Sequence, residues 1–264
     1  MGAYPVDNAW VAALLAGLVF GSLGFFVVLR RLAFIGVGIS HSAVAGAALG
    51  LAAGLSPMTA ASLVTVMTAV AIAGTGRDRL GSDTAIGIYL AAAMGLAALI
   101  LGTDAEHSHE LFAYLFGDLL SVDAGELALL AAAATMVAAG LVVLFRRLML
   151  VAFDEELARA YGVAVDRLDL ALLMLLSLAV LVGVKVVGGL LVTGMLVVPA
   201  ATAALWTSDF RRQVLLAVVL ATACCMAGLA LALRFELSAG GAVVSLAVAA
   251  FAVSLAATRT RAAS

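Results

Sequence analysis

The sequence contains very little charge. Of its 264 residues, 11% are Asp, Glu, Lys or Arg and 66% are hydrophobic, whereas charged residues make up roughly 25% of a typical soluble domain. No polar stretch is long enough to fold separately in water. The composition therefore predicts an all-α, polytopic protein with a single transmembrane domain over residues 1–264, surrounded by lipid and without a nucleic-acid partner.

Lysine and cysteine are also scarce. Lys185 is the only lysine and follows Val184, so the chain has no GxxxxGK[ST] phosphate-binding loop and any ATP chemistry must belong to another chain. Cys224 and Cys225 are adjacent in an apolar run, which excludes a disulfide framework and favours a packing role. Residues 1–8 contain no basic residue, so we expect the first apolar segment to be retained and not cleaved as a signal peptide.

The sequence does contain many long apolar segments. About 20 residues are needed for a helix to cross a bilayer. Nine segments approach that length: 9–29, 33–55, 58–75, 84–102, 124–145, 168–186, 188–205, 213–233 and 240–258. No polar loop separates the sixth from the seventh, so eight crossings with a re-entrant piece is the alternative. We predict a transmembrane helical bundle of about eight to nine spanning helices.

The placement of the basic residues predicts the orientation of this bundle. Cytoplasmic loops carry an excess of Lys and Arg. Twelve of the 14 basic residues lie in alternate loops or at the C-terminus: Arg30, Arg31, Arg77, Arg79, Arg146, Arg147, Arg159, Arg167, Arg211, Arg212, Arg259 and Arg261. We therefore expect the N-terminus outside and the C-terminus inside a plasma or inner membrane.

The second apolar segment carries a lone histidine, His41, and no charged residue lies between Arg31 and Arg77. A titratable group at membrane depth marks a pathway or a site by default. At about 100° per residue, the His41 face is lined by small side chains, and a row of glycines lies roughly opposite. The glycines predicted to serve helix packing are Gly46, Gly50 and Gly54.

We interpret the His41 face as the lining of a metal path. Ser40 is a further candidate ligand beside it. The alternative is a neutral histidine that forms a hydrogen bond with a backbone carbonyl across a helix contact.

Residues 103–110 form a polar outer loop that offers imidazole and carboxylate ligands, which zinc and similar cations select. The candidate residues for capturing a cation are Glu106, His107, His109 and Glu110. The alternative is an ordinary solvated loop.

The cytoplasmic stretch 146–167 is longer than a simple connection requires. It predicts a short helix with Asp154 as its N-cap and Gly162 at its C-terminal end. The residues expected to couple this helix to a cytoplasmic partner are Asp154, Glu155, Glu156, Ala158, Arg159 and Gly162. The alternative is a connector helix on the membrane surface.

Several motifs along the chain together resemble the membrane permeases of ATP-binding-cassette importers for zinc and manganese. They are Arg30–Phe34 leading into Ile39–Ser42, Ser82–Ile88, Tyr114–Leu120, Phe153–Gly162, Lys185–Thr193 and Pro199–Thr202. The resemblance implies a homodimer, an extracytoplasmic metal-binding protein and two cytoplasmic ATP-binding subunits docked at 154–162. The chain departs from the family at Val37, where an aspartate commonly precedes the histidine by four residues.

The sequence thus favours a transport subunit without catalytic residues or a permanent cofactor, carrying zinc in preference to manganese. A secondary cation carrier or channel without an ATPase is the alternative. It would require buried acid or base relays, and apart from Glu126 and Asp169 near their ends the predicted spans contain only His41 and Lys185. A membrane enzyme is disfavoured, because the spans contain no pairing of a nucleophile with a base.

Overall fold

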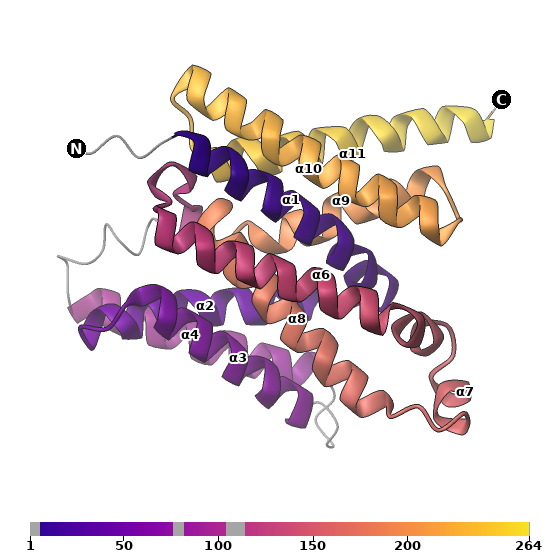
Figure 1. The fold of residues 1–264 in the computed structure, drawn as a ribbon, viewed down its shortest axis with the longest axis horizontal. Coiled ribbons are helices and arrows are strands. Elements are labelled where there is room, and N and C mark those ends of the chain that lie inside the picture. Colours follow the sequence, from indigo (N-terminus) through magenta and orange to yellow (C-terminus); the bar gives the residue numbers. More distant parts are fainter. Residues whose placement is uncertain (1–5, 76–81, 104–113, 264) are drawn as a thin grey trace.

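The protein is a bundle of helices (Figure 1). The computed structural model describes residues 6–75, 82–103 and 114–263, and no strand occurs within these ranges. The elements in chain order are α1 (Val6–Leu29), α2 (Ala33–Ala52), α3 (Pro57–Thr75), α4 (Ser82–Thr103), η1 (Leu119–Ser121), α6 (Ala124–Phe153), α7 (Glu155–Ala160), α8 (Val165–Val186), α9 (Val192–Trp206), α10 (Phe210–Phe235) and α11 (Ala239–Ala263). The predicted all-α class is confirmed.

Helices occupy the nine apolar segments predicted from the sequence. By length and composition seven of them can cross a membrane: α1, α2, α3, α6, α8, α10 and α11. Helix α9 and the stretch Thr84–Ile100 of α4 are shorter apolar helices, so a count of eight to nine crossings stays a prediction. Large apolar side chains such as Leu63, Leu99 and Val142 are exposed on the bundle, as contact with lipid allows.

The stretch between α8 and α9 is a true break. Gly188 has a φ of +89°, and a Cβ placed on it would lie 2.3 Å from Leu115 O, so only glycine fits. Both helices contact α1 and α2, but α9 also packs against α10 and α11, whereas α8 also packs against α3 and α6. The two are therefore separate helices with partly different neighbours.

Helix α1 passes through the middle of the bundle and packs closely on α10. A Cβ placed on Gly17 would lie 2.4 Å from Thr222 Cα, and one placed on Gly21 would lie 2.3 Å from Val218 Cα. The two backbones can approach this closely only because both positions lack a side chain. Phe20 and Leu23, on the same helix, are fully buried.

Two of the three glycines predicted to serve packing lie where α2 meets α3. A Cβ placed on Gly46 would lie 2.7 Å from Ala61 Cα, and one placed on Gly50 would lie 2.8 Å from Ala60 Cβ. Gly54 is different, because it follows the end of α2 and has a φ of +66°. A Cβ placed on it would have no neighbouring atom within 4 Å. Its role is to turn the chain after the helix and not to pack against α3.

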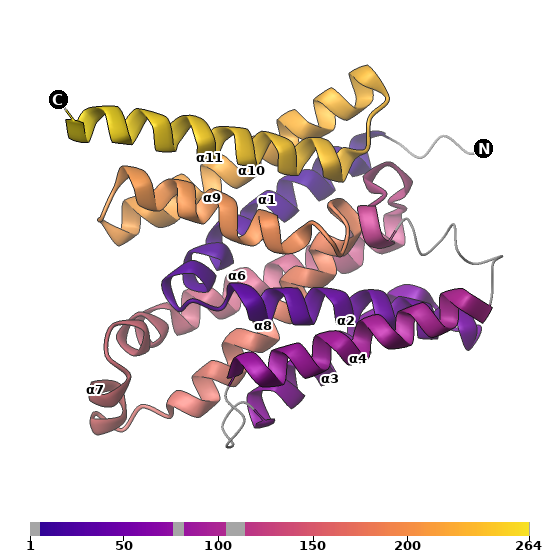
Figure 2. The same ribbon diagram turned by 180° about the vertical axis from the view of Figure 1, so that it is seen from behind.

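The termini lie at opposite ends of the long axis, and α7 lies toward the same end as the C-terminus (Figures 1 and 2). The end that carries α7 also carries the turn after α1 and the start of α10, because successive helices run in alternating directions (Figure 2). The described arginine-rich segments therefore gather at one end of the bundle. This arrangement supports the predicted orientation, which stays a prediction.

Candidate functional site

The helix α7 stands at the arginine-rich end as a short, capped element. Asp154 accepts a hydrogen bond from Leu157 N at 2.8 Å, as an N-cap does. At the other end Gly162 N donates to Arg159 O and Val163 N donates to Ala158 O, both at 3.0 Å. These two bonds form a Schellman motif, and Gly162 supplies the left-handed residue with a φ of +76°. The predicted capped helix is present, and both of its ends are fixed.

One side of α7 is anchored and the other side is free. Ala158 is fully buried, whereas Leu157, Tyr161 and the preceding Phe153 are exposed to 44%, 74% and 60%. Glu156 is exposed beside them. Exposed aromatic and aliphatic side chains on a rigid, charged helix are typical of a surface that binds another protein.

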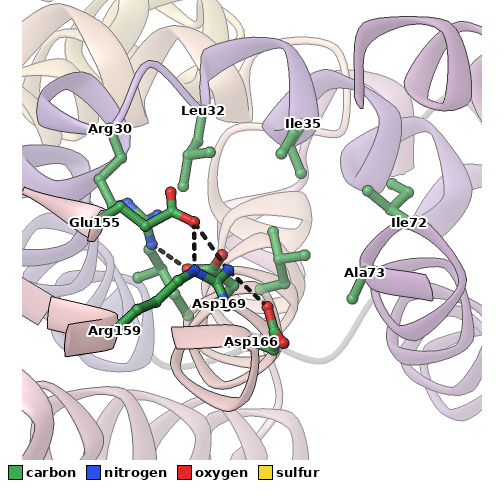
Figure 3. Close-up of a pocket in the computed structure, with 11 residues that line it drawn as sticks. Arg30, Leu32, Ile35, Ile72, Ala73, Glu155, Arg159, Asp166 and Asp169 are labelled. Atoms are coloured by element: carbon green, nitrogen blue, oxygen red, sulfur yellow. Dashed lines mark hydrogen bonds and ion pairs between the residues drawn. The ribbon is translucent and has the colours of Figure 1, made fainter. Parts of the chain in front are cut away.

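Arg159 fastens α7 to α8. Its Nη2 donates to Glu155 Oε1 at 2.9 Å and to Asp166 Oδ1 at 3.0 Å, and Figure 3 shows its guanidinium lying between the two carboxylates. The hydrogen bond that Arg159 donates to Asp166, and then the one it donates to Glu155, raise the pKa of Arg159 above its usual value. Arg159 therefore stays charged at any physiological pH.

A second ion pair, between Arg30 and Asp169, lies next to the first (Figure 3). Arg30 follows the end of α1 and Asp169 belongs to α8. The two pairs line one cavity of about 300 Å³, whose opposite wall includes Ile35 of α2 and Ile72 of α3. The cavity thus joins α7 to the junction of α1 and α2.

Aromatic rings connect this end of the bundle to α10. The rings of Phe153 and Phe210 are 4.8 Å apart and those of Phe25 and Phe210 are 6.4 Å apart, each pair edge to face. Phe26 in turn contacts Phe145 at 5.5 Å. Phe153, just before α7, is therefore packed against α10, which in turn contacts α1.

His41 lies in the middle of α2, on the side that faces α4. Before it along the helix, a Cβ placed on Gly38 would lie 3.2 Å from Ile86 Cγ2, and after it Ala45 clusters with Ala93. Because residues three and four apart share a helix face, His41 belongs to the same stripe. Its Nδ1 is buried and has no hydrogen-bond partner among the described residues. His41 therefore stays a candidate ligand.

Ser40 is less well placed. It is buried, and its hydroxyl donates to Val37 O at 3.0 Å. As the neighbour of His41 it projects about 100° away around the helix. Within the described residues, no three His, Cys, Asp or Glu side chains gather closely enough to hold a metal ion.

The outer-loop candidates Glu106, His107, His109 and Glu110 lie outside the described residues. Among the described residues, Lys185 Nζ pairs with Glu126 Oε1 at 2.5 Å and lies 5.5 Å from the centre of the Tyr114 ring. Gly189 N donates to Tyr114 O at 2.8 Å, so the segment before η1 is paired with the break after α8.

Sequence reasoning missed these ion pairs. Asp166 and Asp169 stand three apart at the start of an apolar helix, and Glu126 stands in the first turn of another. Acids are rare in this chain, so their positions were a usable signal. Arg30 and Lys185 were not identifiable as the partners of Asp169 and Glu126, because they lie far away in the sequence, whereas Arg159 is only seven residues from Asp166.

Comparison with known proteins identifies the family to which the chain is similar. Residues 4–258 match the ABC 3 transport family. The manganese import system permease protein ScaB of Streptococcus gordonii is 30% identical, over 94% of this chain and 90% of its own length. The high-affinity zinc uptake system membrane protein ZnuB of Haemophilus influenzae is 29% identical, over 94% of this chain and 95% of its own length.

A solved structure gives the same result. One chain of PsaBC from Streptococcus pneumoniae in complex with a Fab superposes with a TM-score of 0.84 at 30% identity, and the match covers 94% of this chain and 90% of that one. Together with the seven apolar helices, these matches confirm a multi-pass protein of the plasma membrane.

Proposed function

Because the chain belongs to the ABC 3 transport family, we propose that it is the permease subunit of an ATP-binding-cassette importer for divalent metal ions. Relatives named for manganese import and for zinc uptake match it nearly end to end. The structural observation that carries the proposal is α7, a capped helix that exposes Leu157 and Tyr161 at the arginine-rich end. This surface is where a cytoplasmic ATP-binding subunit docks.

In the proposed mechanism, α7 transmits the movement of the ATPase. Arg159 holds α7 to α8, and Arg30 holds α8 to the turn between α1 and α2. Helix α2 carries His41, so a shift of α7 reaches the metal path through these two ion pairs. Two copies of the chain place two such imidazoles along one path, and an extracytoplasmic metal-binding protein supplies the metal.

We propose zinc as the preferred cargo, ahead of manganese. His41 offers a nitrogen ligand, and Val37, one turn earlier on the same face, offers no oxygen. Nitrogen ligands suit zinc, whereas manganese prefers oxygen. A Val37→Asp variant should therefore shift uptake toward manganese relative to zinc. An unchanged ratio of the two ions would contradict this assignment.

The experiment that tests the permease function is co-purification. A tagged chain expressed with a candidate ATP-binding subunit from the same organism should retain that subunit in detergent, and the Leu157→Glu and Tyr161→Glu variants should lose it. A Phe116→Glu variant places the same charge on an exposed position far from α7 and should retain it. A chain that carries metal without any bound ATPase would instead be a secondary carrier or channel.

A further inference from the structure

A groove of about 780 Å³ runs along the side of the bundle between α1, α6 and α10. Helices α6 and α10 both pack against α1, which forms the floor of the groove. The floor residues Val19 and Phe26 are buried, whereas Leu18 and Val142 at the edges are exposed. The groove is therefore open sideways, toward the hydrocarbon of the bilayer.

The walls of the groove are suited to a hydrocarbon ligand. Only two hydroxyl groups line it, and each is satisfied within its own helix: Ser22 Oγ donates to Leu18 O at 2.6 Å and Thr135 Oγ1 donates to Ala131 O at 2.7 Å. The other lining side chains are aliphatic or aromatic, with one exception. A hydrocarbon chain in the groove would therefore leave neither hydroxyl group without a hydrogen bond.

The exception is Arg146, at the end of the groove nearest α7. It is exposed and forms no ion pair with a described residue. Arg211 is placed to join it, because it precedes Val214 and Val218 by one and two helical turns and both of these line the groove. Arg146 thus lines one end of the apolar groove, and helical spacing places Arg211 on the same side of α10; neither side chain forms an ion pair with a described residue.

The length of the groove matches one leaflet. From Thr135 to Arg146, α6 rises about 16 Å at ~1.5 Å per residue, and half of the hydrocarbon core is about 15 Å. We infer that this groove binds an anionic phospholipid, with an acyl chain between α1, α6 and α10 and its phosphate at Arg146 and Arg211. Basic sites between transmembrane helices recognise anionic head groups in this way.

The test is lipid binding to the purified full chain in nanodiscs and by native mass spectrometry. Phosphatidylglycerol should be retained in preference to phosphatidylcholine with the same acyl chains. Arg146→Gln should weaken phosphatidylglycerol binding by about fivefold, the factor that corresponds to ~1 kcal/mol for one basic residue near an anionic surface. Arg211→Gln should act similarly.

Matched controls separate a site from general attraction. Arg147→Gln removes the same charge one residue away, where the side chain lines a different cavity with Tyr161 and Arg167, and should leave retention unchanged. Ala138→Phe fills the groove and should displace both lipids, whereas Ala139→Phe, on the neighbouring exposed position, should not.

Three results would overturn the inference. Equal retention of the two lipids would show that the groove does not recognise the headgroup. Equal effects of the Arg146 and Arg147 variants would show that only the general surface charge attracts the lipid. Efficient cross-linking between two copies of a Val142→Cys variant would show that a second copy covers the groove in place of lipid.

Discussion

The Arg30 guanidinium and the Asp169 carboxylate form an ion pair that joins the turn after α1 to α8, although the residues are 139 positions apart in the sequence. The Arg30 side chain is only 12% exposed and that of Asp169 is 34% exposed. Loss of one partner from a pair at this depth costs more stability than loss from a surface pair, because the remaining charge is left poorly solvated.

Removal of Asp169 should therefore destabilise the arginine-rich end of the bundle. We expect Asp169→Ala to lower the free energy of unfolding by about 1 to 3 kcal/mol, between the values for exposed and buried pairs. It should also reduce coupling of ATP hydrolysis to uptake. The exchanged variant Arg30→Asp with Asp169→Arg should recover part of both losses in a thermal unfolding and ATPase assay. If the exchanged variant is as impaired as the single one, the pair does not act as a unit.

Proline at Ala158 should disrupt coupling. The Ala158 N–H donates to Asp154 O at 3.0 Å, and proline inside a helix removes that bond and costs about 3 kcal/mol. Transport and ATPase stimulation should fall, while the amount of protein in the membrane stays normal.

Ala164→Pro is the matched control for this change. It lies in the same loop and already has a φ of −74°, close to the value that proline requires. Its transport should equal that of the parent. Parental transport by Ala158→Pro would make α7 a simple connector.

Lys185 should hold the segment that begins at Tyr114 in place. Lys185→Met leaves Glu126 without its partner, and we expect a loss of about 3 kcal/mol in the free energy of unfolding, the order observed when one member of a buried pair is removed. Hydrogen exchange of the Gly189 amide, which donates to Tyr114 O, should become faster. The double variant Lys185→Met with Glu126→Leu should regain stability, because apolar replacement of both partners is often neutral. No recovery in the double variant would argue against a pairing role.

The outer loop should act before translocation if it captures cations. Replacement of His107 and His109 by alanine should raise the metal concentration that gives half-maximal uptake and leave the maximal rate unchanged. A direct binding measurement with the extracytoplasmic metal-binding protein distinguishes cation capture from docking of that protein. An unchanged uptake curve would make residues 103–110 an ordinary solvated loop.

Much of the fold could be predicted because apolar length and helix caps are local signals. Asp154 and Gly162 mark the two ends of α7 in the sequence, and the structure has the expected bonds at both. The family resemblance drawn from the motifs is confirmed by the match over residues 4–258. Gly54 was assigned wrongly because helical periodicity does not show that α2 stops at Ala52.

The rest depends on contacts between distant segments. The pairs Arg30 with Asp169 and Lys185 with Glu126 are set by how whole helices pack. The groove beside α6 likewise exists only because α6 and α10 share α1 as a neighbour. The sequence alone showed that His41 lies on a helix face lined by small residues. In the structure, His41 Nδ1 forms no hydrogen bond with a described residue.

ATP-driven uptake of zinc and manganese into vesicles, by the chain reconstituted with its ATP-binding subunit, tests the central claim most directly. We predict that the parent takes up zinc faster than manganese, that neither ion enters without ATP, and that His41→Gln abolishes uptake while the ATP-binding subunit stays bound. Uptake by the His41→Gln variant at the parental rate, or uptake by the parent in the absence of ATP, would contradict the account.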